Sequence, residues 1–140
     1  MAPGSFSALM KIAERVPSVV ALLAAVVPVA AQTPSITAAR DALASGRVVY
    51  DRHCAACHGA KGDGNGPASV WLYPKPRNFS AGLFKIKSTP GQSLPTDEDL
   101  FQTITRGMPG SSMPSFSYLS EQERRDVVAY VKSLTAYVDA

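Results

Sequence analysis

Two cysteines and a histidine stand close together in the run HCAACHG, at Cys54, Cys57 and His58. Two thiols three positions apart at the end of a helix can each add to one of the two vinyl groups of a haem. The residue after the second thiol then projects its imidazole toward the iron. This C-x-x-C-H spacing is the attachment motif of a c-type haem. It predicts one haem c held by two thioethers, with His58 as the first axial ligand of the iron.

The same residues allow other interpretations. A thioredoxin-like redox pair is expected beside a βαβ pattern, which the sequence does not show. A zinc site needs four ligands, and His53 would have to join the motif because no second ligand pair follows it. A local disulfide is the simplest alternative. The two cysteines are the only ones in the chain, and they lie too close in sequence for a disulfide to cross-link distant parts of a domain.

Two methionines, Met108 and Met113, occur in the short run RGMPGSSMPSF. A haem iron bound by one histidine has a second axial position, and a methionine there raises the reduction potential. The remaining methionines of the chain's four lie within the first ten residues. His53 is the one further histidine, and its neighbour Cys54 would hold it in poor geometry to reach the far face of the haem. The residues themselves leave both methionines as candidates.

The N-terminal region has the pattern of an export signal. Lys11 and Arg15 supply positive charge, and residues 16–31 are apolar, uncharged and end in small side chains. This run is shorter than the roughly twenty residues that a membrane-spanning helix needs. We therefore expect residues 1–31 to be a cleaved signal peptide, residues 32–140 to be the mature domain, and the protein to be periplasmic. A retained membrane anchor is the alternative, and membrane association is expected only in that case.

A first helix is predicted to lead into the cysteine motif. Thr37 is a suitable N-cap for it. Leu43, Val48 and Tyr50 form its apolar face, and Gly46 stands unusually within it.

Two further helices carry clear start signals. The second is expected from about Thr96, whose pairing with Asp99 resembles a capping box, and Gly107 is a natural stop after it. The third begins at Ser120, with Glu123 as its capping partner. Its apolar residues recur at helical spacing: Val127, Tyr130, Val131 and Leu134.

The segment between the first two helices, about residues 59–95, is rich in glycine and proline. An irregular segment of this length is unexpected in a small domain unless it wraps something, which favours a cofactor. No stretch of the sequence alternates as a strand does. The pattern as a whole predicts an all-α domain.

The spacing Gly46-x-x-x-Tyr50-x-x-x-Cys54-x-x-Cys57-His58 resembles the first helix of class I cytochromes c. The run VVAYVKSL, residues 127–134, resembles the closing helix of that family, which meets the first helix where a small glycine allows close approach. The resemblance covers roughly residues 37–136. It implies the class I cytochrome c fold, with three or more helices wrapped around one covalently bound haem c.

The resemblance also assigns roles to individual residues. The run MPSFSYLS is similar to the family pattern around the distal methionine, which makes Met113 the second metal ligand beside His58. A Gly-Pro after the haem motif implies that the Pro67 carbonyl accepts a hydrogen bond from the ligand histidine. Trp71 and Arg77 are implied as partners of the haem propionates.

The resemblance implies electron transfer rather than catalysis. Without Lys11, Glu14 and Arg15, the chain's 14 basic and 11 acidic residues become 12 and 10, a balance that gives no reason to expect nucleic acid as a partner. Lysines could instead steer an acidic redox protein toward the haem: Lys61, Lys75, Lys85 and Lys87.

The stretch RNFSAGLFKIKSTPGQSLPTDEDL resembles a subgroup of monohaem cytochromes that serve respiratory dehydrogenases and oxidases. We therefore expect a carrier of single electrons between respiratory redox partners, cycling between ferrous and ferric iron. Two alternatives remain. The chain could be a haem c subunit of a larger dehydrogenase or oxidase complex, or a haem enzyme with an open distal site.

Overall fold

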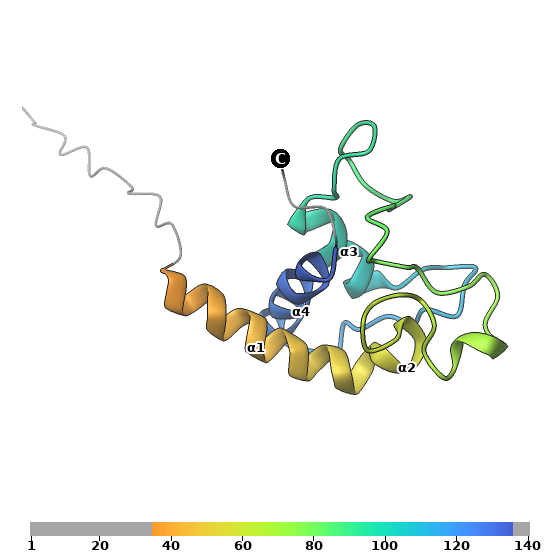
Figure 1. The fold of residues 1–140 in the computed structure, drawn as a ribbon, viewed down its shortest axis with the longest axis horizontal. Coiled ribbons are helices and arrows are strands. Elements are labelled where there is room, and N and C mark those ends of the chain that lie inside the picture. The colour runs from red at the N-terminus through yellow and green to blue at the C-terminus, as the bar shows by residue number, and fades with distance from the viewer. Residues whose placement is uncertain (1–34, 136–140) are drawn as a thin grey trace, which may run out of the picture. The chain divides into compact units, whose positions relative to one another are not determined.

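The computed structural model describes residues 35–135, and the predicted signal peptide lies outside them. The expected boundary between residues 31 and 32 therefore stays a prediction. The described part contains four α-helices, one 3-10 turn and no strand: α1 Ile36–His53, α2 Ala55–His58, η1 Ser69–Trp71, α3 Asp97–Arg106 and α4 Glu121–Ser133 (Figure 1). The predicted all-α class is confirmed. None of these helices is long and apolar enough to cross a membrane.

Helices α1 and α4 cross at Gly46. A Cβ atom on this residue would lie 2.1 Å from the main-chain oxygen of Asp126 and 3.0 Å from the Cβ of Tyr130. One turn further along α1, Tyr50 is fully buried, and its ring centroid lies 5.2 Å from that of Tyr130. The crossing therefore explains a glycine in the middle of a helix, as the sequence predicted.

The beginning of α1 differs from the prediction. The N-cap is Ser35 and not Thr37, because the Ser35 hydroxyl accepts a hydrogen bond of 3.3 Å from the N–H of Ala38. Capping therefore starts the helix two residues earlier than expected.

The buried face of α1 also differs from the predicted one. Gly46, Val49 and Tyr50 are the buried residues of the helix, whereas Leu43 is 37% exposed and Val48 is 57% exposed. Residues spaced by three and four share one face of a helix, and here that face is fixed by the contact with α4. Val48 falls on the opposite side, and Leu43 lies one turn before the crossing.

The predicted capping boxes of α3 and α4 are both present. Thr96 Oγ1 accepts from the Asp99 N–H (3.1 Å), and the Asp99 carboxylate accepts from the Thr96 N–H (2.9 Å). Ser120 and Glu123 repeat this exchange at the start of α4, at 3.2 and 2.9 Å. Gly107 ends α3 with a φ of 72°, a conformation that glycine adopts readily.

The irregular segment after α2 is fastened to that helix. The N–H of Gly66 donates to the Cys57 carbonyl at 3.2 Å, and the N–H of Ala68 donates to the Ala56 carbonyl at 2.9 Å. These bonds set η1 beside α2, which Figure 1 shows at the same end of the domain. The beginning of the long segment predicted from the glycines and prolines is therefore tied to α2 by main-chain hydrogen bonds.

Candidate functional site

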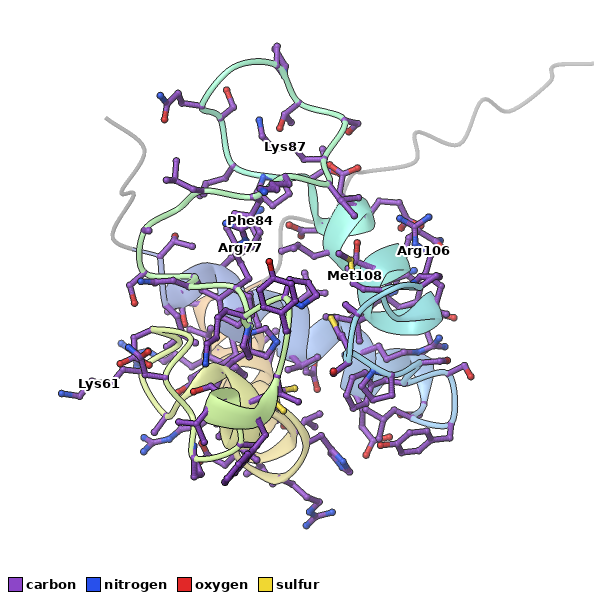
Figure 2. The ribbon with its side chains drawn as sticks, turned by 90° about the vertical axis from the view of Figure 1, so that its right-hand side faces the viewer. Lys61, Arg77, Phe84, Lys87, Arg106 and Met108 are labelled. Atoms are coloured by element: carbon purple, nitrogen blue, oxygen red, sulfur yellow. The ribbon has the colours of Figure 1, made fainter. Side chains whose placement is uncertain are left out.

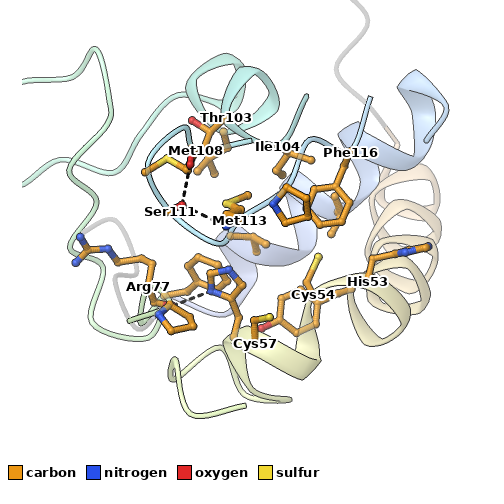
Figure 3. A pocket seen from close by; sticks show the side chains of 18 of the residues that line it. His53, Cys54, Cys57, Arg77, Thr103, Ile104, Met108, Ser111, Met113 and Phe116 are labelled. Atoms are coloured by element: carbon orange, nitrogen blue, oxygen red, sulfur yellow. Dashed lines mark hydrogen bonds between the residues drawn. The ribbon is translucent and has the colours of Figure 1, made fainter. Parts of the chain in front are cut away.

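A cavity of about 600 Å³ opens between the cysteine motif, the loops on either side of α3, and helix α4 (Figure 3). This volume lies within the range of ligand sites, about 300–1,000 Å³. The chemically active residues of its wall are Cys54, Cys57, His58, Met108 and Met113. Much of the remaining wall is apolar, contributed by α3, α4 and the loops: Phe79, Phe84, Leu100, Ile104, Val127 and Val131.

The cysteines reach the cavity because the chain makes a single turn of helix between them. Cys54 ends α1, and its carbonyl accepts from the N–H of His58 at 2.9 Å. The cysteines are not joined in a disulfide. Burial raises the pKa of the Cys54 thiol most, and the neighbouring Cys57 adds to the increase. Together they bring this pKa to about 12. The Cys54 sulfur is thus held as a neutral thiol.

The imidazole of His58 is fixed on two sides. Its Nδ1 lies 3.0 Å from the main-chain oxygen of Arg77, an acceptor, which places the ring proton on Nδ1. The ring also stacks on Phe79, with centroids 4.5 Å apart and planes 18° from parallel. Burial lowers the pKa of His58, and the bond to the Arg77 carbonyl opposes this in part. The lowered pKa favours the neutral imidazole, and a proton on Nδ1 leaves the lone pair of Nε2 free, the form that binds a metal.

The hydrogen-bond acceptor of His58 corrects the assignment of Pro67. Pro67 is exposed, and the residues on either side of it are tied to the carbonyls of α2, so this segment lies along that helix. Arg77 supplies the acceptor instead, ten residues later. Nothing in the sequence singles out this carbonyl as the acceptor.

The two methionines belong to one hydrogen-bonded loop. The N–H of Met108 donates to the Met113 carbonyl at 3.1 Å. Between them, the Ser111 hydroxyl donates to the Met108 carbonyl at 2.8 Å and accepts from the Met113 N–H at 3.2 Å. Met113 packs against the hydrophobic core, and in Figure 3 its side chain lies between those of Met108 and the cysteines. Both line the cavity, so the assignment of the distal ligand to Met113 stays a prediction.

The two predicted propionate partners are placed differently. Arg77 lines the cavity, as its assigned role requires. Trp71 is 86% exposed and is not part of the cavity wall. The short η1 turn buries Ser69 and leaves Trp71 pointing to solvent, so the structure does not bring this residue to the cofactor site.

Two aromatic contacts of the site were not predicted from the sequence. Phe79 supplies the face on which His58 stacks. Tyr118, which also lines the cavity, places its hydroxyl 3.3 Å from Nδ1 of His53. No motif or spacing in the sequence singles out either contact, because both depend on the path of the loops.

The donor set fits a haem c. Two thiols stand on one wall with an imidazole directly after them, thioether sulfurs line the same cavity, and the rest of the wall suits an apolar macrocycle. Across residues 35–135, no three His, Cys, Asp or Glu side chains gather as a cage for a metal ion. The zinc interpretation of His53, Cys54, Cys57 and His58 therefore gains no support from the geometry.

Comparisons with known proteins identify the family of the chain. The sequence matches the family model for cytochrome c over residues 43–135, more than half of the 140-residue chain. A chain in the Kuenenia stuttgartiensis reducing HAO-like protein complex Kustc0457/Kustc0458 is 46% identical, with a TM-score of 0.63, over 65% of this chain and 41% of that one. This protein thus spans less than half the length of that relative.

A second solved structure is more distant. Cytochrome CL from the marine methylotrophic bacterium Methylophaga aminisulfidivorans is 22% identical, with a TM-score of 0.49, over 67% of this chain and 55% of that one. No curated protein sequence matches significantly.

Proposed function

Because this chain belongs to the cytochrome c family, we propose that it is an exported monohaem cytochrome that carries single electrons between respiratory redox partners. Family membership makes it an electron-transfer haem protein. The proposal adds that one haem c is attached through Cys54 and Cys57, and that His58 and Met113 are the axial ligands. The observation that carries it is the meeting of two thiols, the His58 imidazole and a core-packed methionine in one largely apolar cavity.

The residues of the cavity suit a carrier rather than a catalyst. A bound haem supplies a one-electron couple between ferrous and ferric iron. Apolar side chains from α3 and α4 exclude water, and a buried apolar site disfavours the more highly charged oxidised state, which raises the reduction potential. The Arg77 carbonyl and Phe79 hold His58 in one orientation, so little structure has to rearrange when the charge changes.

Met113 is supported as the distal ligand by its packing. It contacts the hydrophobic core, which limits the positions that its sulfur can take. Met108 lies where α3 has just ended at Gly107, and it is not among the residues packed against the core. We propose that Met108 closes the ligand loop through its hydrogen bond to the Met113 carbonyl and does not bind iron.

A second candidate is a haem c subunit of a larger redox complex. One observation favours it: the chain resembles, at 46% identity, part of a longer protein solved within a HAO-like protein complex. In such a subunit the same cavity would hold the same haem, and the electron would pass through a permanent contact with the other subunits of the complex. Export to the periplasm, proposed from the pattern of residues 1–31, is shared by both candidates.

Potentiometric titration of the purified holoprotein tests the carrier function. We expect a single one-electron step and no binding of carbon monoxide by the reduced protein, since both axial positions are filled by side chains. Rapid binding of carbon monoxide would instead mean an open distal site and a haem enzyme. Sedimentation of the protein from its own cells separates the two candidates, since a free carrier sediments as a single mature chain and a subunit sediments with its complex.

A further inference from the structure

Three large apolar side chains are exposed within four residues of one turn. Val70 is 66% exposed, Trp71 86% and Tyr73 90%. Single exposed apolar residues are ordinary on a protein surface, but a contiguous group marks an interaction site. Tryptophan and tyrosine are also the residues most enriched among those that dominate binding energy at protein interfaces. We call residues 70–73 the aromatic turn.

The aromatic turn is held rigidly in place. The N–H of Trp71 donates to the Ala68 carbonyl at 3.1 Å, and that of Ala68 donates to Ala56 in α2 at 2.9 Å. Lys75 closes the other side, where its ammonium donates to the Ser69 carbonyl at 2.7 Å. A surface fixed before binding loses little conformational entropy when a partner docks.

The aromatic turn lies next to the cysteine motif. Through Gly66 and Ala68 its segment is hydrogen-bonded to the carbonyls of Cys57 and Ala56. These are residues of the short helix that presents Cys57 and His58 to the cavity. A protein that covers the aromatic turn therefore also approaches the wall to which the cofactor is attached.

Charge on this part of the chain is of one sign. Residues 64–96 contain no aspartate or glutamate but four cationic side chains: Lys75, Arg77, Lys85 and Lys87. Figure 2 shows Arg77 and Lys87 on the loops of this segment. The nearest carboxylates in sequence are Asp63 before it and Asp97 after it. Of the four cations, Lys75 is hydrogen-bonded beside the turn, whereas Arg77 and Lys85 line the cavity. Positive charge beside the turn favours an acidic partner and disfavours a second copy of the same surface.

We propose that the aromatic turn is the centre of a docking surface for a redox protein whose contact face is apolar and rimmed with carboxylates. This inference rests on the proposed electron-carrier function and names the chemistry of its partner. Trp71 and Tyr73 supply the desolvated centre of the contact. Lys75 beside the turn, and the cations Arg77 and Lys85 at the cavity, orient the two proteins and make association depend on salt.

The test uses the holoprotein and a surface of defined chemistry. Gold is coated with a mixed layer of methyl-terminated and carboxylate-terminated alkanethiols, and binding is measured with a quartz microbalance. Layers of either component alone serve as references. The wild type is expected to bind the mixed layer more tightly than both references. The double variant Trp71→Ala/Tyr73→Ala is expected to bind the mixed layer at least tenfold more weakly.

Ile36→Ala is the matched control. Ile36 is also exposed, at 75%, but it begins α1 and lies 17 residues before His53, about 25 Å along a helix. Its replacement is expected to leave binding unchanged. Equal binding by the wild type and the double variant would contradict the proposal, as would an equal loss in Ile36→Ala. A wild-type dimer that the double variant abolishes in sedimentation would also contradict it, since the turn would then bind a second copy.

The absorption spectrum and midpoint potential keep this test separate from that of the proposed function. Both are expected to be the same in all three proteins, because none of the exchanged side chains lines the cavity. If binding fails while the spectrum and potential are those of a His/Met-ligated haem, the docking surface is wrong and the carrier function stands. If the wild type has neither the spectrum nor the potential of a His/Met-ligated haem, the proposed function itself is wrong. The docking surface, which rests on that function, is then wrong too.

Discussion

Replacing Gly46 by alanine tests the contact on which the helical framework depends. The added Cβ would lie 2.1 Å from the main-chain oxygen of Asp126 and 2.6 Å from its carbonyl carbon. Ordinary contacts between such atoms are longer by about 1 Å or more, since non-bonded carbon contacts are optimal at about 3.5–4.0 Å. The obstacle is backbone rather than the end of a flexible side chain. Helices α1 and α4 would therefore have to move apart.

Two effects of opposite sign determine the size of the change. Alanine favours a helix over glycine by about 1 kcal/mol. Overpacking a tight contact costs about 1–3 kcal/mol, occasionally more, and here the strain falls on two main chains beside the fully buried Tyr50. We expect the strain to exceed the propensity gain and to give a net loss of about 2 kcal/mol of unfolding free energy. For a domain of this size, that is a decrease in Tm of about 10 °C.

Chemical unfolding of the holoprotein, followed by circular dichroism and by haem absorbance, measures this change. Ser45→Ala is the control, because Ser45 is the exposed neighbour of Gly46 in the same helix and its change should stay within about 0.5 kcal/mol. An unfolding free energy of Gly46→Ala equal to or above that of the wild type would contradict this prediction. It would mean that helix propensity outweighs the close crossing of α1 and α4.

Two further predictions concern the loops around the site. The Asp99 carboxylate accepts from Ser88 and from Thr96, and the backbone bond from Ser88 contributes most to lowering the pKa of Asp99 from 3.8 to about 2. The contribution of the ionised Asp99 carboxylate to stability is therefore complete above pH 4 and is lost as the pH falls toward 2. The stability of Asp99→Asn should lack this loss between pH 4 and pH 2, as measured by acid unfolding. Identical acid-unfolding profiles of the wild type and the variant would contradict the prediction. Phe79→Ala should cost about 3–5 kcal/mol, measured by guanidinium unfolding, and it removes the surface on which His58 stacks. A loss below 1 kcal/mol would mean that Phe79 is not part of the core.

The parts of the fold that depend on local chemistry could be predicted from the sequence. Side-chain oxygens at Thr96 and Ser120 satisfy main-chain N–H groups within three residues, so both capping boxes are visible in a short stretch of sequence. The crossing at Gly46 was expected from the resemblance to class I cytochromes c, which explains a glycine inside a helix. The start of α1 was misplaced because Ser35 and Thr37 are both good caps and only the folded chain decides between them.

The site was predictable where covalent spacing defines it and not where tertiary contacts do. The positions of Cys54, Cys57 and His58 on one wall follow from a single turn of helix. The acceptor for His58 did not follow, because the path of a glycine- and proline-rich loop decides whether Pro67 or Arg77 reaches the imidazole. Trp71 was assigned to the cavity by resemblance, and the 3-10 turn that directs it to solvent has no signal in the sequence.

The most direct test of the account is the absorption spectrum of the oxidised holoprotein, recorded for the wild type, Met113→Ala and Met108→Ala. We expect a methionine-to-iron charge-transfer band that disappears in Met113→Ala and remains in Met108→Ala. Loss of the band in Met108→Ala alone would leave the carrier function unchanged and would make Met108 the distal ligand. A wild type that lacks the band and binds carbon monoxide when reduced would contradict the proposed electron carrier.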